Sequence, residues 1–166
     1  MKRILCLLMA ILLIGMFAAC SDEETEGVAF ADLSIGGTKI TIDAEAPSVL
    51  AALGEYRAFA ETGSCYGDGK DRVYEYTSFK LKTYTNGDKE YILAVEIFND
   101  ADASVATPEG VRIGASRDAV IAAYGEASDA SDAKLVYLHR DGKIKLQFLL
   151  RDGAVTNIRY LKTDAN

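Results

Sequence analysis

The sequence predicts an α+β fold of two tandem repeats, each a short helix packed on an antiparallel meander of three to four strands. Two observations predict it. Residues 40–55 align without a gap on residues 111–126, at an offset of 71. The strand-like segments that follow each copy repeat at an offset of 63, and Asn86-Gly87 and Asp152-Gly153 supply hairpin turns between them. The sequence leaves open whether the two repeats share one sheet or form two.

Residues 1–19 have the layout of a secretory signal peptide. Lys2 and Arg3 open the chain, an apolar run follows over residues 4–17, and small residues lead into Cys20. The apolar run is shorter than the roughly 20 residues that cross a bilayer, so a membrane-spanning helix is disfavoured. A cysteine directly after the small residues marks a bacterial lipoprotein, in which the thiol takes a lipid. We therefore expect lipidation at Cys20; the alternative is an ordinary signal peptide beside a bystander cysteine.

Residues 20–29 are expected to form an acidic, solvated tether between the lipid and the body. Palmitate-like chains on Cys20 and on its amino group would supply more than one acyl chain, which is what durable anchoring to a membrane needs. The expected location is the exported side of a bacterial cell membrane or outer membrane.

The two repeats are predicted over residues 30–106 and 107–166, and each begins with a short strand and a short helix. Ser116 has the residue type of a helix N-cap. Gly54 and Gly125 stand where each helix would end with a left-handed residue.

Charge and cysteine content argue against a nucleic-acid-binding protein and against a fold stabilised by internal disulfides. The net charge is −7, and loss of residues 1–19, which hold two basic residues and no acid, brings it to about −9. Phosphate backbones repel so acidic a body, so nucleic-acid binding is disfavoured. Cys6 leaves with the signal peptide and Cys20 takes the lipid. Cys65 is then the one thiol of the body, and no internal disulfide framework can form.

The two repeat offsets differ by eight residues, which places an insertion in the first repeat, within residues 61–70. Cys65 lies in this insertion, and inserted loops often carry binding sites. Cys65 is therefore a candidate for partner binding and for a disulfide-linked dimer. The alternative is a tolerated surface loop whose cysteine is buried as a small hydrophobe.

A short motif begins at residues 107–116, with the sequence Thr-Pro-Glu-Gly-Val-Arg-Ile-Gly-Ala-Ser, and continues with Val120 and Tyr124-Gly125. A weaker copy of it occurs over residues 42–54. The pattern resembles small bacterial lipoproteins with tandem helix-plus-sheet repeats. That group shares the architecture of the β-lactamase inhibitory protein and of the small barrel-assembly lipoproteins of the outer membrane. The inhibitory protein has a disulfide in each repeat, which this chain cannot form internally, so its β-lactamase-binding function is not carried over.

Candidate catalytic and metal-binding residues are few. His139 is the sole histidine, and a nucleophile–base pair would need Cys65 beside it, with Asp141 to orient the ring. Nothing in the spacing of these residues supports that arrangement. Residues 67–71 and 99–102 contain oxygen ligands but lack the calcium-loop pattern, and zinc would need a His/Cys cluster. We expect no catalytic site, no metal and no cofactor.

A binding surface has more support. A helix covers one face of each meander, so the other face is open unless the repeats pack there. Tyr and basic residues on a sheet suit recognition, because Tyr contributes contact area at low entropic cost. The candidate partner-binding residues are Cys65, Tyr74, Tyr76, Lys82 and Tyr84. The alternative is that several of the tyrosines belong to the edge of the core.

The sequence thus predicts a lipid-anchored envelope lipoprotein that is a non-enzymatic protein-binding or scaffold module, with a protein partner in the envelope. An envelope enzyme or redox protein that uses Cys65 is the alternative.

Overall fold

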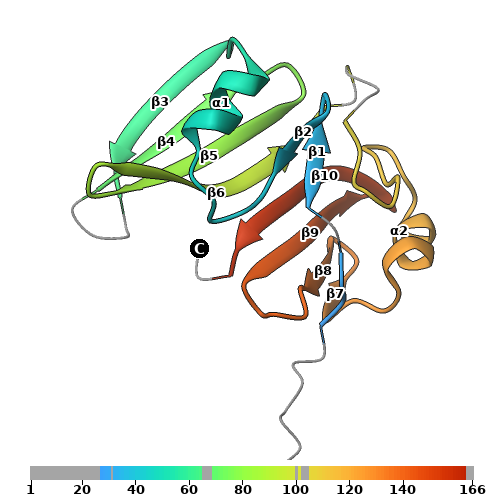
Figure 1. The fold of residues 1–166 in the computed structure, drawn as a ribbon. Coiled ribbons are helices and arrows are strands. Elements are labelled where there is room, and N and C mark those ends of the chain that lie inside the picture. Colours follow the sequence, from blue (N-terminus) through green and yellow to red (C-terminus); the bar gives the residue numbers. More distant parts are fainter. Residues whose placement is uncertain (1–26, 31, 65–68, 100, 102–104, 164–166) are drawn as a thin grey trace, which may run out of the picture.

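The computed structural model of the chain describes residues 27–30, 32–64, 69–99, 101 and 105–163 (Figure 1). Of these residues, 50% lie in strands and 12% in two helices, so the fold is mostly β. In chain order the elements are β1 (Leu33–Ile35), β2 (Thr38–Ile40), α1 (Pro47–Leu53), β3 (Ala58–Gly63), β4 (Lys70–Glu75), β5 (Phe79–Asn86), β6 (Lys89–Ile97), α2 (Arg117–Tyr124), β7 (Asp129–Ser131), β8 (Lys134–Leu138), β9 (Ile144–Arg151) and β10 (Ala154–Lys162).

Strands β3 to β10 form one antiparallel sheet in the order β3-β4-β5-β6-β10-β9-β8-β7, and β1 and β2 form a separate two-stranded sheet. The prediction of two helix-plus-meander repeats is therefore wrong. At the centre of the large sheet β6 pairs with β10, with Ile97 opposite Ile158 and Ala94 opposite Leu161. In two separate meanders β6 and β10 would be unpaired edges, and their pairing satisfies the backbone groups of both.

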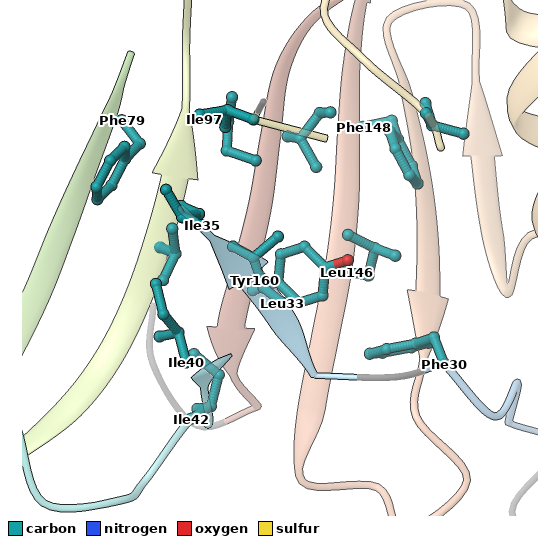
Figure 2. Close-up of a cluster of buried hydrophobic side chains, with 14 of the residues drawn as sticks. Phe30, Leu33, Ile35, Ile40, Ile42, Phe79, Ile97, Leu146, Phe148 and Tyr160 are labelled. Carbon is teal, nitrogen blue, oxygen red and sulfur yellow. The ribbon is translucent and has the colours of Figure 1, made fainter. Parts of the chain in front are cut away.

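The core lies on one face of the large sheet. The β1–β2 hairpin lies over the junction of β6 and β10, and the two helices lie on the same side (Figure 1). Leu33 and Ile40 of the hairpin are almost fully buried, and Leu33 lies beside Tyr160 of β10 (Figure 2). Apolar and polar residues alternate in β9 from Ile144 to Phe148, and Leu146 and Phe148 face this core.

The start of α2 and the last residues of both helices fall at the positions that the sequence predicts. Ser116 caps α2, because its side chain accepts a hydrogen bond from the backbone N–H of Ala119 at 3.2 Å. Gly54 and Gly125 follow the last residues of α1 and α2 at φ of 76° and 79°, where a side chain would be strained. Their ψ of −150° and −155° lies outside the left-handed helical region that the sequence predicts. The helices are short, and no helix in the described ranges is long and apolar enough to cross a membrane.

The start of the described chain is fixed to the sheet. The backbone N–H of Val28 donates a hydrogen bond to the carbonyl of Leu138 at 2.9 Å, at the end of β8. Gly27 lies so close to Arg140 that an added Cβ would come within 2.7 Å of its backbone. The last residues assigned to the tether by sequence are therefore packed against the body.

Candidate functional site

Two of the sequence-predicted residues, Cys20 and Cys65, lie outside the described residues. Ser64 and Gly69 stand on either side of the range 65–68 that contains Cys65. The backbone N–H of Ser64 donates a hydrogen bond to the carbonyl of Gly69 at 3.0 Å, at the end of the β3–β4 hairpin. This hairpin is at one edge of the large sheet, whereas His139 follows β8 near the other edge.

His139 and Asp141 lie in contact, as the orienting half of a catalytic pair would. His139 Nδ1 is 2.7 Å from Asp141 Oδ1. The same carboxylate accepts a hydrogen bond from the backbone N–H of Lys143 at 2.9 Å. That backbone hydrogen bond, followed by the contact with His139, lowers the pKa of Asp141. This is the geometry of a tight turn between β8 and β9, in which the Asp141 carboxylate accepts a hydrogen bond from the backbone two residues further on.

Tyr74 and Tyr76 are buried on the core side of the sheet and do not form an exposed surface. The Tyr74 hydroxyl donates a hydrogen bond to Glu90 at 2.9 Å. Burial, and then this hydrogen bond, raise the pKa of Tyr74 to about 12. Tyr76 stacks on Phe79 with ring centroids 4.5 Å apart. These two tyrosines therefore occupy the core-edge role that the sequence left as the alternative.

Tyr84 is also buried, and its hydroxyl lies between two charged groups. It donates a hydrogen bond to Asp43 Oδ1 at 2.6 Å and lies 3.3 Å from the ammonium of Lys162. Lys162 itself contacts Asp43 at 3.0 Å. Tyr84 thus ties β5 to the loop before α1 and to the end of β10.

Lys82 is the one candidate of the described set that reaches a solvent-facing surface. It lines a groove of about 380 Å³ on the face of the sheet opposite the core. We call this the sheet groove; its lining residues are Lys82, Leu93, Ala94, Glu96, Lys145, Gln147, Arg159 and Leu161. They come from β5, β6, β10 and β9, so the groove lies across the central junction of the sheet.

The carboxylate of Glu96 contacts the polar side chains around it in the sheet groove. Arg159 donates to Glu96 Oε1 from Nε at 3.1 Å and from Nη2 at 2.8 Å, and Asn157 donates to the same oxygen at 3.0 Å. Lys82 lies 3.7 Å from the second oxygen. Burial alone would raise the pKa of Glu96, but these hydrogen bonds and charges outweigh it and lower the pKa below its ordinary value.

The sheet groove differs in charge from the chain as a whole. Its charged lining residues are three cations, Lys82, Lys145 and Arg159, and one anion, Glu96. The chain has a net charge of −7. Lys145 has no ion pair among the residues that the structure describes. A cationic groove with apolar walls on an acidic protein is suited to an acidic partner surface.

Sequence reasoning missed Glu96, Arg159 and Lys145. A signal for the first two was present, because Glu96 is the one charged residue in an apolar stretch from Ile92 to Ile97. The 63-residue offset that aligns the strands also aligns Glu96 with Arg159, a pair of opposite charge.

No group of three or more His, Cys, Asp or Glu side chains that could hold a metal ion occurs within the described ranges. Comparison of the chain with models of protein families, with curated proteins and with solved structures finds no match.

Proposed function

We propose that this chain is a lipid-anchored lipoprotein of the bacterial envelope and a non-enzymatic module that binds a protein partner through the sheet groove. The residues that support the anchor are the basic start, the apolar run and the small residues before Cys20. The resemblance of residues 107–116 to small envelope lipoproteins supports the same location.

The observation that carries the binding proposal is the uncovered face of the large sheet. The hairpin and both helices lie on the core side (Figure 1), and the sheet groove runs across the middle of the other side. An antiparallel sheet with one face packed normally turns polar residues to solvent on the other. Here Leu93, Ala94 and Leu161 line the groove between the charges, which gives it apolar contact area as well.

Electrostatics indicate the kind of partner. Glu96 is already neutralised by Arg159 and Lys82, so it presents little free negative charge. Lys145 lines the groove without an ion-pair partner among the described side chains. A partner surface with a carboxylate beside apolar residues would pair with Lys145 and cover the apolar wall. The partner we propose is therefore a protein with an acidic, partly apolar contact patch.

The experiment is affinity capture of the full, tagged chain from cross-linked cells of its own bacterium. The wild type is compared with Lys145→Glu, which reverses the free charge of the groove. Arg112→Glu is the matched control, because Arg112 is exposed in the loop before α2 and lies outside the groove. Circular dichroism shows whether each variant is folded.

The proposal expects a protein that the wild type and Arg112→Glu recover equally and that Lys145→Glu recovers about tenfold less, as for loss of one well-placed charge contact. Equal recovery by Lys145→Glu excludes the sheet groove as the site. If the wild type recovers nothing above an unrelated lipoprotein, the binding function itself is excluded.

A further inference from the structure

A second and larger hollow lies on the core side of the molecule, between the β1–β2 hairpin and the end of β10. Its volume is about 890 Å³, within the range of roughly 300–1,000 Å³ that is typical of small-molecule sites. We call it the hairpin cleft. Its walls come from the hairpin and the loop after it, from the β8–β9 turn and from the last residues of β10.

The inner wall of the hairpin cleft is apolar and aromatic. Phe30, Ile42 and Tyr160 line it, and all three side chains are buried (Figure 2). The ring of Phe30 stands edge-on to Tyr160 at 6.1 Å between centroids, and edge-on to His139 at 5.0 Å. An apolar chain or ring that enters the cleft would replace water against these surfaces, which is favourable.

The rim of the hairpin cleft is charged, and two of its three carboxylates pair with a lysine. The pairs are Asp32 with Lys39 at 2.8 Å and Asp43 with Lys162 at 3.0 Å. The third carboxylate, Asp141, contacts His139 at 2.7 Å and accepts a hydrogen bond from the backbone N–H of Lys143 at 2.9 Å.

Lys143 is the rim cation that remains. Its ammonium makes no ion pair within the part of the chain that the structure describes, and it faces Asp43 and Asp141, which both have nearer partners. The turn that holds it is fixed to the end of β10. The backbone N–H of Thr163 donates to the carbonyl of Lys143 at 2.9 Å, and the Thr163 hydroxyl donates to the carbonyl of Gly142 at 2.6 Å.

We propose that the hairpin cleft binds a small apolar carboxylate, with its apolar part against Phe30, Ile42 and Tyr160 and its carboxylate beside Lys143. A cationic ligand would find Asp32 and Asp43 already paired with lysines, and it would meet the ammonium of Lys143 as a like charge. The carboxylate of Asp141 is already engaged by His139 and by the backbone of Lys143. A neutral ligand would gain the apolar contact alone. Lys143 is the rim cation without an ion pair among the described residues, so it favours an anion, and the apolar inner wall favours an apolar body for that ligand.

The test uses the full chain in the processed form that a bacterial host makes, held in phosphatidylcholine nanodiscs. The probes are 2-naphthoate and its cationic counterpart, 2-naphthylmethylammonium, which share one ring system. Binding is measured by isothermal titration calorimetry against nanodiscs without protein. Saturable binding of 2-naphthoate, about tenfold tighter than that of the ammonium probe, is expected.

Two substitutions test whether 2-naphthoate binds in the hairpin cleft beside Lys143. Lys143→Met removes the charge from an exposed turn and is expected to weaken 2-naphthoate binding about tenfold. Arg112→Met is its control, because Arg112 is also exposed and lines neither the hairpin cleft nor the sheet groove. It is expected to leave 2-naphthoate binding unchanged.

A third variant, Thr41→Trp, fills the hairpin cleft from a half-buried position and is expected to abolish binding of 2-naphthoate while the chain still unfolds cooperatively. The proposal is overturned if 2-naphthoate does not bind saturably, if the ammonium probe binds as tightly, or if Lys143→Met binds like the wild type. These results are independent of the sheet groove, because Lys143 does not line it.

Discussion

Arg159 donates two hydrogen bonds to a single carboxylate oxygen of Glu96, and the two residues lie directly opposite each other on β10 and β6. This is the one pair of strands that joins the first half of the large sheet to the second. On the core face the same junction is held by apolar residues, with Ile97 opposite Ile158. The junction is thus held by an ion pair on its open face and by packing on its covered face.

Replacement of Glu96 with Gln should make the free energy of unfolding less dependent on pH below about pH 5. The pKa of Glu96 is lowered in the folded state from an ordinary value of 4.5, so its carboxylate stabilises the fold above that pH. This contribution is lost as the pH falls from about 4.5 through the lower folded-state pKa. Glu96→Gln should cost about 1–3 kcal/mol at pH 7, because hydrogen bonds to a charged group are lost.

The measurement is urea unfolding of wild type and Glu96→Gln from pH 7 to pH 3. The exposed Glu126→Gln serves as the control, since the Glu126 side chain makes no hydrogen bond or ion pair among those the structure describes. The difference between wild type and Glu96→Gln should shrink as the pH falls. A difference that stays constant over the whole range would contradict the lowered pKa.

Gly69→Ala should destabilise the β3–β4 hairpin. A Cβ at this position would lie 2.2 Å from the backbone carbonyl oxygen of Thr85, so β4 or β5 would have to move. We expect a loss of about 1–3 kcal/mol, as for other overpacked sites. Gly63→Ala is the control, because its Cβ would meet nothing within 4 Å. It should be neutral or stabilising by about 0.4–1 kcal/mol in thermal unfolding.

Ser116→Ala should weaken the start of α2. The Ser116 side chain accepts the N–H of Ala119, and removal of such a cap costs about 1 kcal/mol. Chemical denaturation should show this loss. Ser131→Ala in β7 should cost less, because that residue contributes only its backbone carbonyl, which accepts from Arg117. An equal loss in both variants would rule out the capping role.

Cys20→Ala should abolish lipidation. Cells grown with an alkyne-tagged palmitate should label the wild type, and the label should be absent from the variant. Where residues 1–19 are still removed, the variant should also leave the membrane fraction, because no acyl chain would hold it. A wild type that takes no label would contradict lipidation at Cys20.

Local features of the fold could be predicted from the sequence, and the long-range ones could not. The ends of both helices follow from Ser116, Gly54 and Gly125, because capping depends on residues next to each other in the chain. The pairing of β6 with β10 joins residues about 60 positions apart, such as Ile97 and Ile158. Nothing in the alternation of either strand indicates which partner it takes, so the single sheet could not be predicted.

The candidate site shows the same division. That Tyr74 and Tyr76 share a face could be predicted from strand periodicity, but which face is covered depends on where the hairpin and α1 pack. Both tyrosines lie on the face of the sheet that the hairpin and helices cover. Lys82 lies on the opposite, uncovered face, beside Glu96. Charge and residue type alone could not separate these two outcomes.

If Cys20 carries a lipid, as we propose, the hydrogen bond from Val28 to Leu138 limits how far from the membrane the chain can enter the body. Seven residue steps separate Cys20 from Gly27, and even a fully extended chain of that length spans at most about 25 Å. With Cys20 lipidated, the point where the chain enters the body, at the end of β8, can stand no further than this from the bilayer surface. His139 follows directly after β8 and lines the hairpin cleft, so the mouth of that cleft would open within a short distance of the lipid headgroups.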